Sequence, residues 1–288
     1  MMRPFLLGAT ALALTALFAS AEAQTVAPFV TAAVNDAGRP VADKMRDANR
    51  KPAESIAFAG VKPGDKVVDF LAGGGYFTRL LSKVVGPQGH VYATAAAPAM
   101  AGGMAGGATG AMPMGGSMPM GGAMGQNGGM PMGGQMGAQM GNMGMADGLQ
   151  AIASNPAYAN VSELKQSPSK LMAPEPVDVV WTSQNYHDLH NTGGYHADDI
   201  AVLNKSVFDA LKPGGVFLVS DYVAQSGSGF TQSQMLHRGD PEATKAEILK
   251  AGFVFDGESK VLAKPGDAHT MRAHEQDDQF MFRFRKPK

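Results

Sequence analysis

The sequence feature that most constrains the fold is a glycine cluster that follows a short apolar run. Residues 67–78 read VVDFLAGGGYFT, in which an apolar run ends in an acid before three consecutive glycines. Glycines let backbone amides approach a ligand closely, and the start of a helix offers unpaired N–H groups. The order predicts a strand, a tight turn and a helix that together hold a nucleotide-like ligand.

Strands and helices alternate along most of the chain. Apolar runs and helical periodicity, separated by Gly and Pro signals, predict strands over Lys66–Phe70, His90–Ala93, Val161–Leu164, Val177–Trp181 and Val216–Ser220, and helices over Phe77–Val85, Asp198–Leu211 and Pro241–Ala251. Two further strands, Phe253–Leu262 and Gln279–Arg285, are expected to pair as an antiparallel edge. Alternating strands and helices predict a parallel α/β sheet with its ligand crevice at the carboxyl ends of the strands.

A low-complexity segment interrupts this pattern at residues 97–146. Thirteen of the 20 methionines lie between Met100 and Met145, mostly among glycines and alanines, and no charged residue occurs there. Ordering so much glycine is entropically costly, so we predict a flexible insert within the domain. Its Met-Pro-Met and Met-Gly-Met pairs present thioethers that suit Cu(I), and copper binding is an alternative to a passive insert.

The amino terminus is typical of an exported protein. Arg3 precedes an apolar segment from Phe5 to Phe18, and a small-x-small site follows at residues 21–23. This predicts a cleaved signal peptide over residues 1–23, since the segment is shorter than the about 20 apolar residues of a membrane anchor. Residues 24–50 are expected to form a loose lead-in with a short helix around Val41–Asn49. The mature chain is predicted to be periplasmic or secreted, without a stable membrane anchor.

Composition excludes several classes of site. The chain of 288 residues has no cysteine, so it has no disulfides, thiolate metal sites or thiol nucleophiles. With a formal net charge of -1, the chain has no overall excess of basic residues of the kind that binds nucleic acid. Nucleic acid is therefore not favoured as a partner.

Three motifs make the chain resemble the class I S-adenosylmethionine-dependent methyltransferases, and more narrowly a group of exported bacterial proteins predicted to be methyltransferases. They are VVDFLAGGGYFT (residues 67–78), VDVVWTSQNYHDLH (177–190) and LKPGGVFLVSDY (211–222). The resemblance covers residues 51–286 outside the insert. It implies a Rossmann-like, seven-stranded, mostly parallel sheet in the order 3-2-1-4-5-7-6, with the last strand antiparallel and helices on both faces.

The same resemblance implies a set of residues that bind S-adenosylmethionine. Asp69 takes the acidic position of the first motif, while Leu71 replaces its first glycine. No carboxylate follows the second strand, where the family usually binds the ribose hydroxyls, and Thr94 offers a single hydroxyl in its place. The predicted cofactor-binding residues are Asp69, Ala72, Gly73, Gly75, Thr94 and Ser183.

The polar run after the fourth predicted strand is the candidate substrate site. Two histidines with a carboxylate between them suit a general base near neutral pH. Asp221 and His237 are further candidates to face the pocket. We assign no metal ligands, although His187 and His190, with Asp188 or His196, form an alternative metal set. The predicted catalytic residues are Tyr186, His187, Asp188 and His190.

Two functions remain open at this point. The first is an exported methyltransferase that acts on an unknown small molecule. The second is a periplasmic binding or scaffold protein that keeps the fold without turnover, with or without a copper-binding insert. The intact glycine turn favours the enzyme, whereas the missing ribose acid and the export signal favour the second hypothesis.

Overall fold

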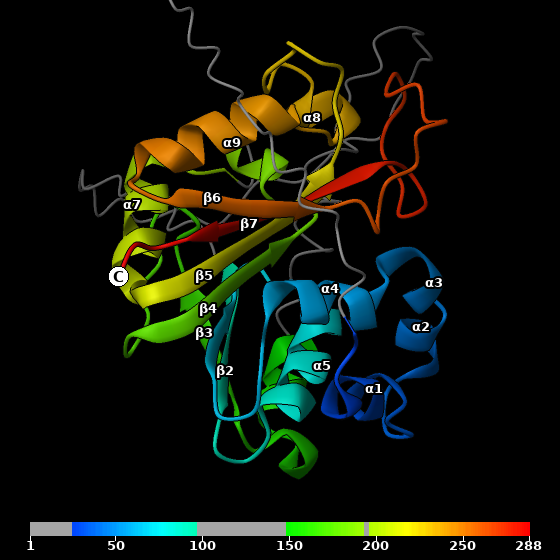
Figure 1. Cartoon of the computed structure of the whole chain (residues 1–288), viewed down its shortest axis with the longest axis vertical. Coiled ribbons are helices and arrows are strands. Elements are labelled where there is room, and N and C mark those ends of the chain that lie inside the picture. The colour runs from blue at the N-terminus through cyan, green and yellow to red at the C-terminus, as the bar shows by residue number, and fades with distance from the viewer. Residues whose placement is uncertain (1–24, 97–147, 193–195) are drawn as a thin grey trace, which may run out of the picture.

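The computed structural model describes residues 25–96, 148–192 and 196–288, which build a seven-stranded sheet with helices on both faces (Figure 1). The strand order is β3-β2-β1-β4-β5-β7-β6. This confirms the predicted fold class and strand order. The strands are β1 (Lys66–Asp69), β2 (His90–Ala96), β3 (Val161–Gln166), β4 (Val177–Ser183), β5 (Leu211–Tyr222), β6 (Val254–Ser259) and β7 (Gln279–Arg285).

Strand direction also follows the prediction. Strands β1 to β5 pair in parallel, while β7 runs antiparallel to both of its neighbours, β5 and β6. The carboxyl ends of β1, β4 and β5 therefore lie at one edge of the sheet, and any ligand that uses the loops after these strands binds there.

The helices are α1 (Pro28–Val34), α2 (Val41–Lys44), α3 (Asp47–Arg50), α4 (Pro52–Ala59), α5 (Tyr76–Val85), α7 (Ile200–Ala210), α8 (Ser233–Leu236) and α9 (Pro241–Lys250), with short 3₁₀ turns η1 (Pro156–Tyr158) and η2 (His187–His190) and a helical segment over residues 148–153. Capping side chains define the starts of the two long helices that follow the insert. Asp199 accepts hydrogen bonds from the first-turn amides of α7, and Asp240 does so for α9, which has proline at its first position.

Two hydrophobic cores lie on opposite faces of the sheet. Successive strand residues alternate between them, so that Val67 packs with α4 and α5 on one face, while Val68 packs on the face of α7 and α9. Figure 1 shows α1 to α5 together on one side of the sheet and α7 with α9 on the other. A central sheet buried on both faces gives the strand ends a rigid frame.

The lead-in that was predicted to be loose forms α1, α2 and α3, and its Val30 and Ala33 are buried in the first core. Strand β5 begins at Leu211, earlier than predicted, because residues 214 and 215 form hydrogen bonds with Lys286. The predicted signal peptide lies outside the described residues, as does the predicted insert. Within the described ranges, no helix is long and apolar enough to cross a membrane.

Candidate functional site

The loops after β1, β4 and β5 meet at the carboxyl edge of the sheet. Asn185 ties two of them together, because its side-chain amide donates to the carbonyl of Leu71 at 2.8 Å and to that of Ser183 at 2.7 Å. Gln184, directly after β4, has a positive φ of 62° and donates its backbone N–H to the carbonyl of Ser220 at 2.7 Å. The chain therefore turns sharply at the end of β4 and remains attached to β5.

Residues 71–75 form the glycine turn, whose backbone is largely left-handed. The φ angles of Leu71, Gly73 and Gly75 are 61°, 56° and 78°. Leu71 thus adopts the conformation that glycine would adopt more easily, at a cost on the order of 1 kcal/mol. Thr94 on β2 holds this conformation, since its hydroxyl accepts the Leu71 N–H at 2.8 Å and its carbonyl accepts the Ala72 N–H at 3.1 Å. The replacement of the first motif glycine by leucine leaves the turn intact.

The three glycines of the turn have different surroundings. A Cβ atom added at Gly73 or Gly74 would meet no described atom within 4 Å. One added at Gly75 would lie 2.2 Å from the Cδ1 atom of Ile152. A side chain at Gly75 would be strained by its positive φ and would displace Ile152 of the 148–153 helix, whereas the Cβ positions of Gly73 and Gly74 point into space that no described atom fills.

Asp69 lies beneath the turn and is 3% exposed. The Thr78 hydroxyl donates to its Oδ2 atom at 2.6 Å. Burial raises the pKa of the Asp69 carboxyl to about 6, although the hydrogen bond from Thr78 and the positive charge of Arg50 oppose the shift. The carboxyl can therefore change its charge near neutral pH.

A second polar group beside the turn was not predicted from the sequence. Arg50, at the end of α3, donates to Gln184 Oε1 at 2.5 Å and pairs with Glu275. Its guanidinium lies 4.7 Å from the centre of the Tyr76 ring. No motif marks Arg50 or Glu275, because they are separated by more than two hundred residues and meet only in the folded chain.

The other predicted cofactor residues lie close to this turn. Ala72 is part of the glycine turn, and Thr94 accepts hydrogen bonds from the turn's backbone amides. The Ser183 hydroxyl, at the end of β4, accepts a hydrogen bond from the Ser220 hydroxyl at 3.0 Å. Glu163 on β3 was not predicted. It pairs with Ala93 of β2 and has one buried carboxylate oxygen, Oε1, without a hydrogen-bond partner among the described residues.

Two of the four predicted catalytic residues, Tyr186 and His190, contact the same carboxylate oxygen of Glu247. The Tyr186 hydroxyl donates to Glu247 Oε1 at 2.7 Å and accepts from Asn204 at 2.8 Å, and Tyr186 is buried. His190 places its Nε2 atom 2.9 Å from the same carboxylate oxygen, and its ring stacks on Phe230 with 3.4 Å between centroids. Burial raises the pKa of the Tyr186 hydroxyl well above its ordinary value, so the phenol stays protonated.

The other two, His187 and Asp188, belong with Asp221 and His237 to a separate group, here called the His187 cluster. His187 is 1% exposed, and its Nδ1 atom lies 2.7 Å from Asp221 Oδ1. Its Nε2 atom lies 3.2 Å from Asp188 Oδ1 and 3.3 Å from His237 Nδ1. Burial alone would lower the pKa of the His187 imidazole, but the carboxylates of Asp221 and Asp188 outweigh it and raise that pKa to about 10.

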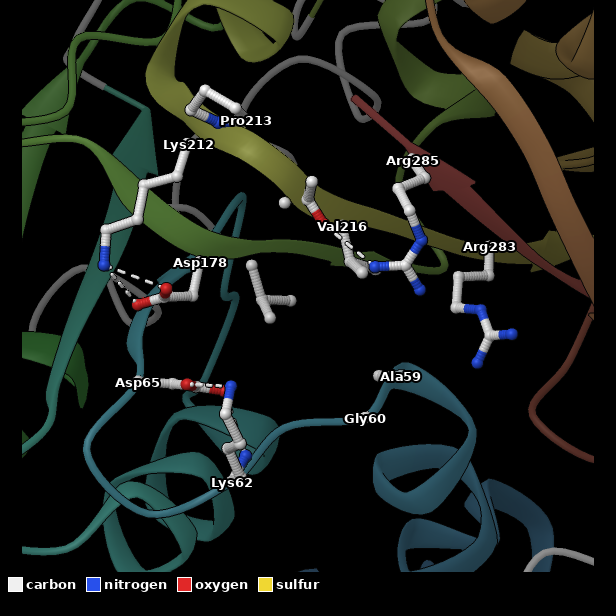
Figure 2. A pocket seen from close by; sticks show the side chains of 13 residues that line it. Ala59, Gly60, Lys62, Asp65, Asp178, Lys212, Pro213, Val216, Arg283 and Arg285 are labelled. Carbon is white, nitrogen blue, oxygen red and sulfur yellow. Dashed lines mark hydrogen bonds and ion pairs between the residues drawn. The ribbon is translucent and has the colours of Figure 1, made fainter. Parts of the chain in front are cut away.

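The opposite edge of the sheet has a different character. Figure 2 shows a pocket lined by residues at the amino ends of β1, β4 and β5. Lys62 pairs with Asp65 at 2.7 Å, and Lys212 pairs with Asp178 at 2.8 Å. The lysines that line this pocket are thus neutralised by carboxylates of the protein, and the polar residues predicted to bind ligands lie at the other edge.

No protein-family model matches the chain, and no curated protein matches it. Solved structures resemble it at low sequence identity. A SAM-dependent methyltransferase from Aquifex aeolicus is 16% identical over 84% of this chain and 95% of its own, with a TM-score of 0.49. Fibrillarin from Aeropyrum pernix with bound S-adenosyl-L-methionine is 13% identical, over 83% of this chain and 76% of its own, with a TM-score of 0.45.

A protein from Bordetella parapertussis described as a possible exported protein is 14% identical, over 85% of this chain and 68% of its own, with a TM-score of 0.43. The fold assignment rests on the strand order and on the antiparallel β7 of this chain.

Proposed function

We propose that this chain is an exported methyltransferase that transfers the methyl group of S-adenosylmethionine to a small molecule. The observation that carries the proposal is the open space beside Gly73 and Gly74, where an added Cβ would meet no described atom within 4 Å, at the carboxyl edge of a sheet with this strand order. In such sheets, ligands bind beyond the carboxyl ends of the strands. The turn also precedes α5, whose first amides add positive partial charge.

The cofactor side would use mainly the backbone of the glycine turn. The residues predicted to line the cofactor site are Asp69, Ala72, Gly73, Gly75, Thr94 and Ser183. Arg50 lies beside this site. Gly75 contributes by allowing the turn to pack on Ile152. The chain lacks an acid at the end of β2. Glu163 on the neighbouring strand β3 is our candidate for the carboxylate that binds the ribose hydroxyls, because one of its oxygens is buried with no hydrogen-bond partner among the described residues.

The acceptor side would use the His187 cluster. Methyl transfer breaks the bond between the cofactor sulfur and the methyl carbon as a new bond forms to the acceptor, which then loses a proton if the attacking atom is O–H or N–H. Asp188 is our candidate to accept this proton, because its carboxylate is partly exposed, and His187 Nε2 lies 3.2 Å from its Oδ1 atom and would orient it. Tyr186 and His190 would act indirectly, by holding the loop through Glu247.

Calorimetry with S-adenosylmethionine and S-adenosylhomocysteine tests the cofactor assignment. We expect both to bind the mature chain, and Asp69→Ala to weaken binding at least tenfold, or about 1.4 kcal/mol. Asp65→Ala is the matched control, because Asp65 is equally buried at 4% exposure but lies at the opposite end of β1. Failure to detect either compound at millimolar concentration, or equal losses in the two variants, would contradict the assignment.

A separate measurement distinguishes turnover from binding alone. The mature chain with S-adenosylmethionine and a mixture of small hydroxyl and amine acceptors should release S-adenosylhomocysteine. Tight binding without release from any acceptor would support the binding-protein hypothesis instead.

A further inference from the structure

Three side-chain donor atoms of the His187 cluster converge on one point beyond the ends of β4 and β5. They are His187 Nε2, Asp188 Oδ1 and His237 Nδ1. Their separations are 3.2 Å from His187 to Asp188, 3.3 Å from His187 to His237 and 3.2 Å from His237 to Asp188. The three atoms therefore form a nearly equilateral triangle.

The size of this triangle matches one face of a metal coordination sphere. In a tetrahedral zinc site with bonds of about 2.0 to 2.1 Å, two ligand atoms lie about 3.3 to 3.4 Å apart. Charge-assisted hydrogen bonds between nitrogen and carboxylate are shorter, at about 2.7 to 2.9 Å. The cluster contains such a bond elsewhere, because His187 Nδ1 lies 2.7 Å from Asp221. The longer separations fit three atoms arranged around a common centre.

Asp221 orients the buried histidine for this role. Its carboxylate accepts the backbone N–H of His187 at 2.6 Å and that of Tyr222 at 2.8 Å, in addition to contacting the His187 ring. Since Asp221 accepts the Nδ1–H, the proton that a metal ion displaces is the one on Nε2, and the lone pair left there is directed at the centre of the triangle. A carboxylate behind a coordinating histidine is the usual support for such a ligand.

The remaining two donors make the site reachable. The side chains of Asp188 and His237 are 23% and 28% exposed, so an ion and its water can enter from their side. His237 follows α8 with a positive φ of 51° and is therefore held in a conformation that few side chains adopt. His190, the partner suggested by sequence spacing, instead contacts Glu247.

From this geometry we propose that His187, Asp188 and His237 bind a divalent transition-metal ion of the zinc type, and that Asp221 positions His187. Two imidazole nitrogens and one carboxylate oxygen suit zinc, with a fourth position left for water or an acceptor atom. The donors lie within 4.8 Å of one another. The proposal rests on the cluster itself and stands whether or not the chain transfers methyl groups.

Titration of Zn²⁺ into the purified chain, freed of any histidine tag and of cofactor, tests the site. We expect one ion per chain with micromolar or tighter affinity. Zinc avoids confusion with methionine thioethers, which favour softer Cu(I). Bound Co²⁺ should give the intense visible absorption of a four-coordinate ion. Sub-stoichiometric or millimolar binding would overturn the proposal.

Variants assign the binding to these residues. His237→Ala removes a partly exposed ligand and should weaken Zn²⁺ binding at least about 100-fold, while circular dichroism shows that the chain remains folded. Asp221→Asn should weaken it about 10- to 100-fold. His274→Ala is the matched control, because the side chain of His274 is 62% exposed and lies outside the cluster. Zinc affinity that is unchanged in His237→Ala, or equally lowered in His274→Ala, would refute the assignment.

Discussion

The glycine turn and the His187 cluster lie at the same edge of the sheet but are built differently. The turn is five consecutive residues defined by their backbone conformation, and a Cβ added at Gly73 or Gly74 would meet no described atom within 4 Å. The cluster combines side chains from the loop after β4, the end of β5 and the residue after α8. A backbone site is therefore visible in a short stretch of sequence, whereas a side-chain site depends on how distant segments are brought together.

This difference also determines how each site responds to substitution. In the turn, the identity of a residue matters through φ and through the space for a Cβ atom. In the cluster, it matters through donor atoms and charge. The following variants test whether the two sites are as separate as their construction implies.

Gly75→Ala should give the largest effect, with a loss of about 2 to 5 kcal/mol in the free energy of unfolding. The new methyl group would lie 2.2 Å from Ile152, and the residue would keep a φ of 78°. Gly74→Ala is the matched variant, because its Cβ meets no described atom within 4 Å. It should change stability by less than about 0.5 kcal/mol but weaken S-adenosylmethionine binding. Urea unfolding and calorimetry measure the two quantities, and equal stability losses in both variants would contradict the distinct roles of the two glycines.

Asp69 should make stability depend on pH. Its pKa in the folded chain is raised from 3.8 to about 6, so protonated Asp69 stabilises the fold below about pH 4, and this contribution is lost as the pH rises through 6. Between pH 5 and pH 8, the loss amounts to about 1.4 kcal/mol. Asp69→Asn cannot titrate, so the difference in unfolding free energy between wild type and variant should shift by this amount. Parallel pH profiles for the two proteins would show that Asp69 is not a buried, titrating carboxyl.

Much of the fold was predictable because its signals are local. Apolar runs such as residues 177–181 mark buried strands, and glycine and proline mark their ends. The strand order came with the resemblance of three motifs and is confirmed by the sheet. The helices of the lead-in were mostly missed because they are short and depend on tertiary contacts, through Val30 and Ala33, with the rest of the core.

In the candidate site too, the local backbone feature was predictable and the side-chain cluster was not. The turn after Asp69 was predicted as a ligand-binding backbone, although Leu71 departs from the motif, and the structure shows that Leu71 adopts the required positive φ. His237 was predicted only to face the pocket, with no partner assigned. Its contacts with His187 and Asp188 depend on where α8 packs. Glu247, which divides the four predicted catalytic residues into two groups, had no signal in the sequence.

The smallest effect concerns His190, which shares the η2 turn with the cluster but not its contacts. His190→Gln would lose the stacking on Phe230 and weaken the contact with Glu247, and it should lower the free energy of unfolding by about 1 kcal/mol. Zinc affinity should not change, because no donor atom of the cluster is altered. His237→Ala should show the reverse, with a small change in stability and a large loss of zinc. If His190→Gln also weakened zinc binding tenfold, the two halves of η2 would form one site, and the separation between them would be wrong.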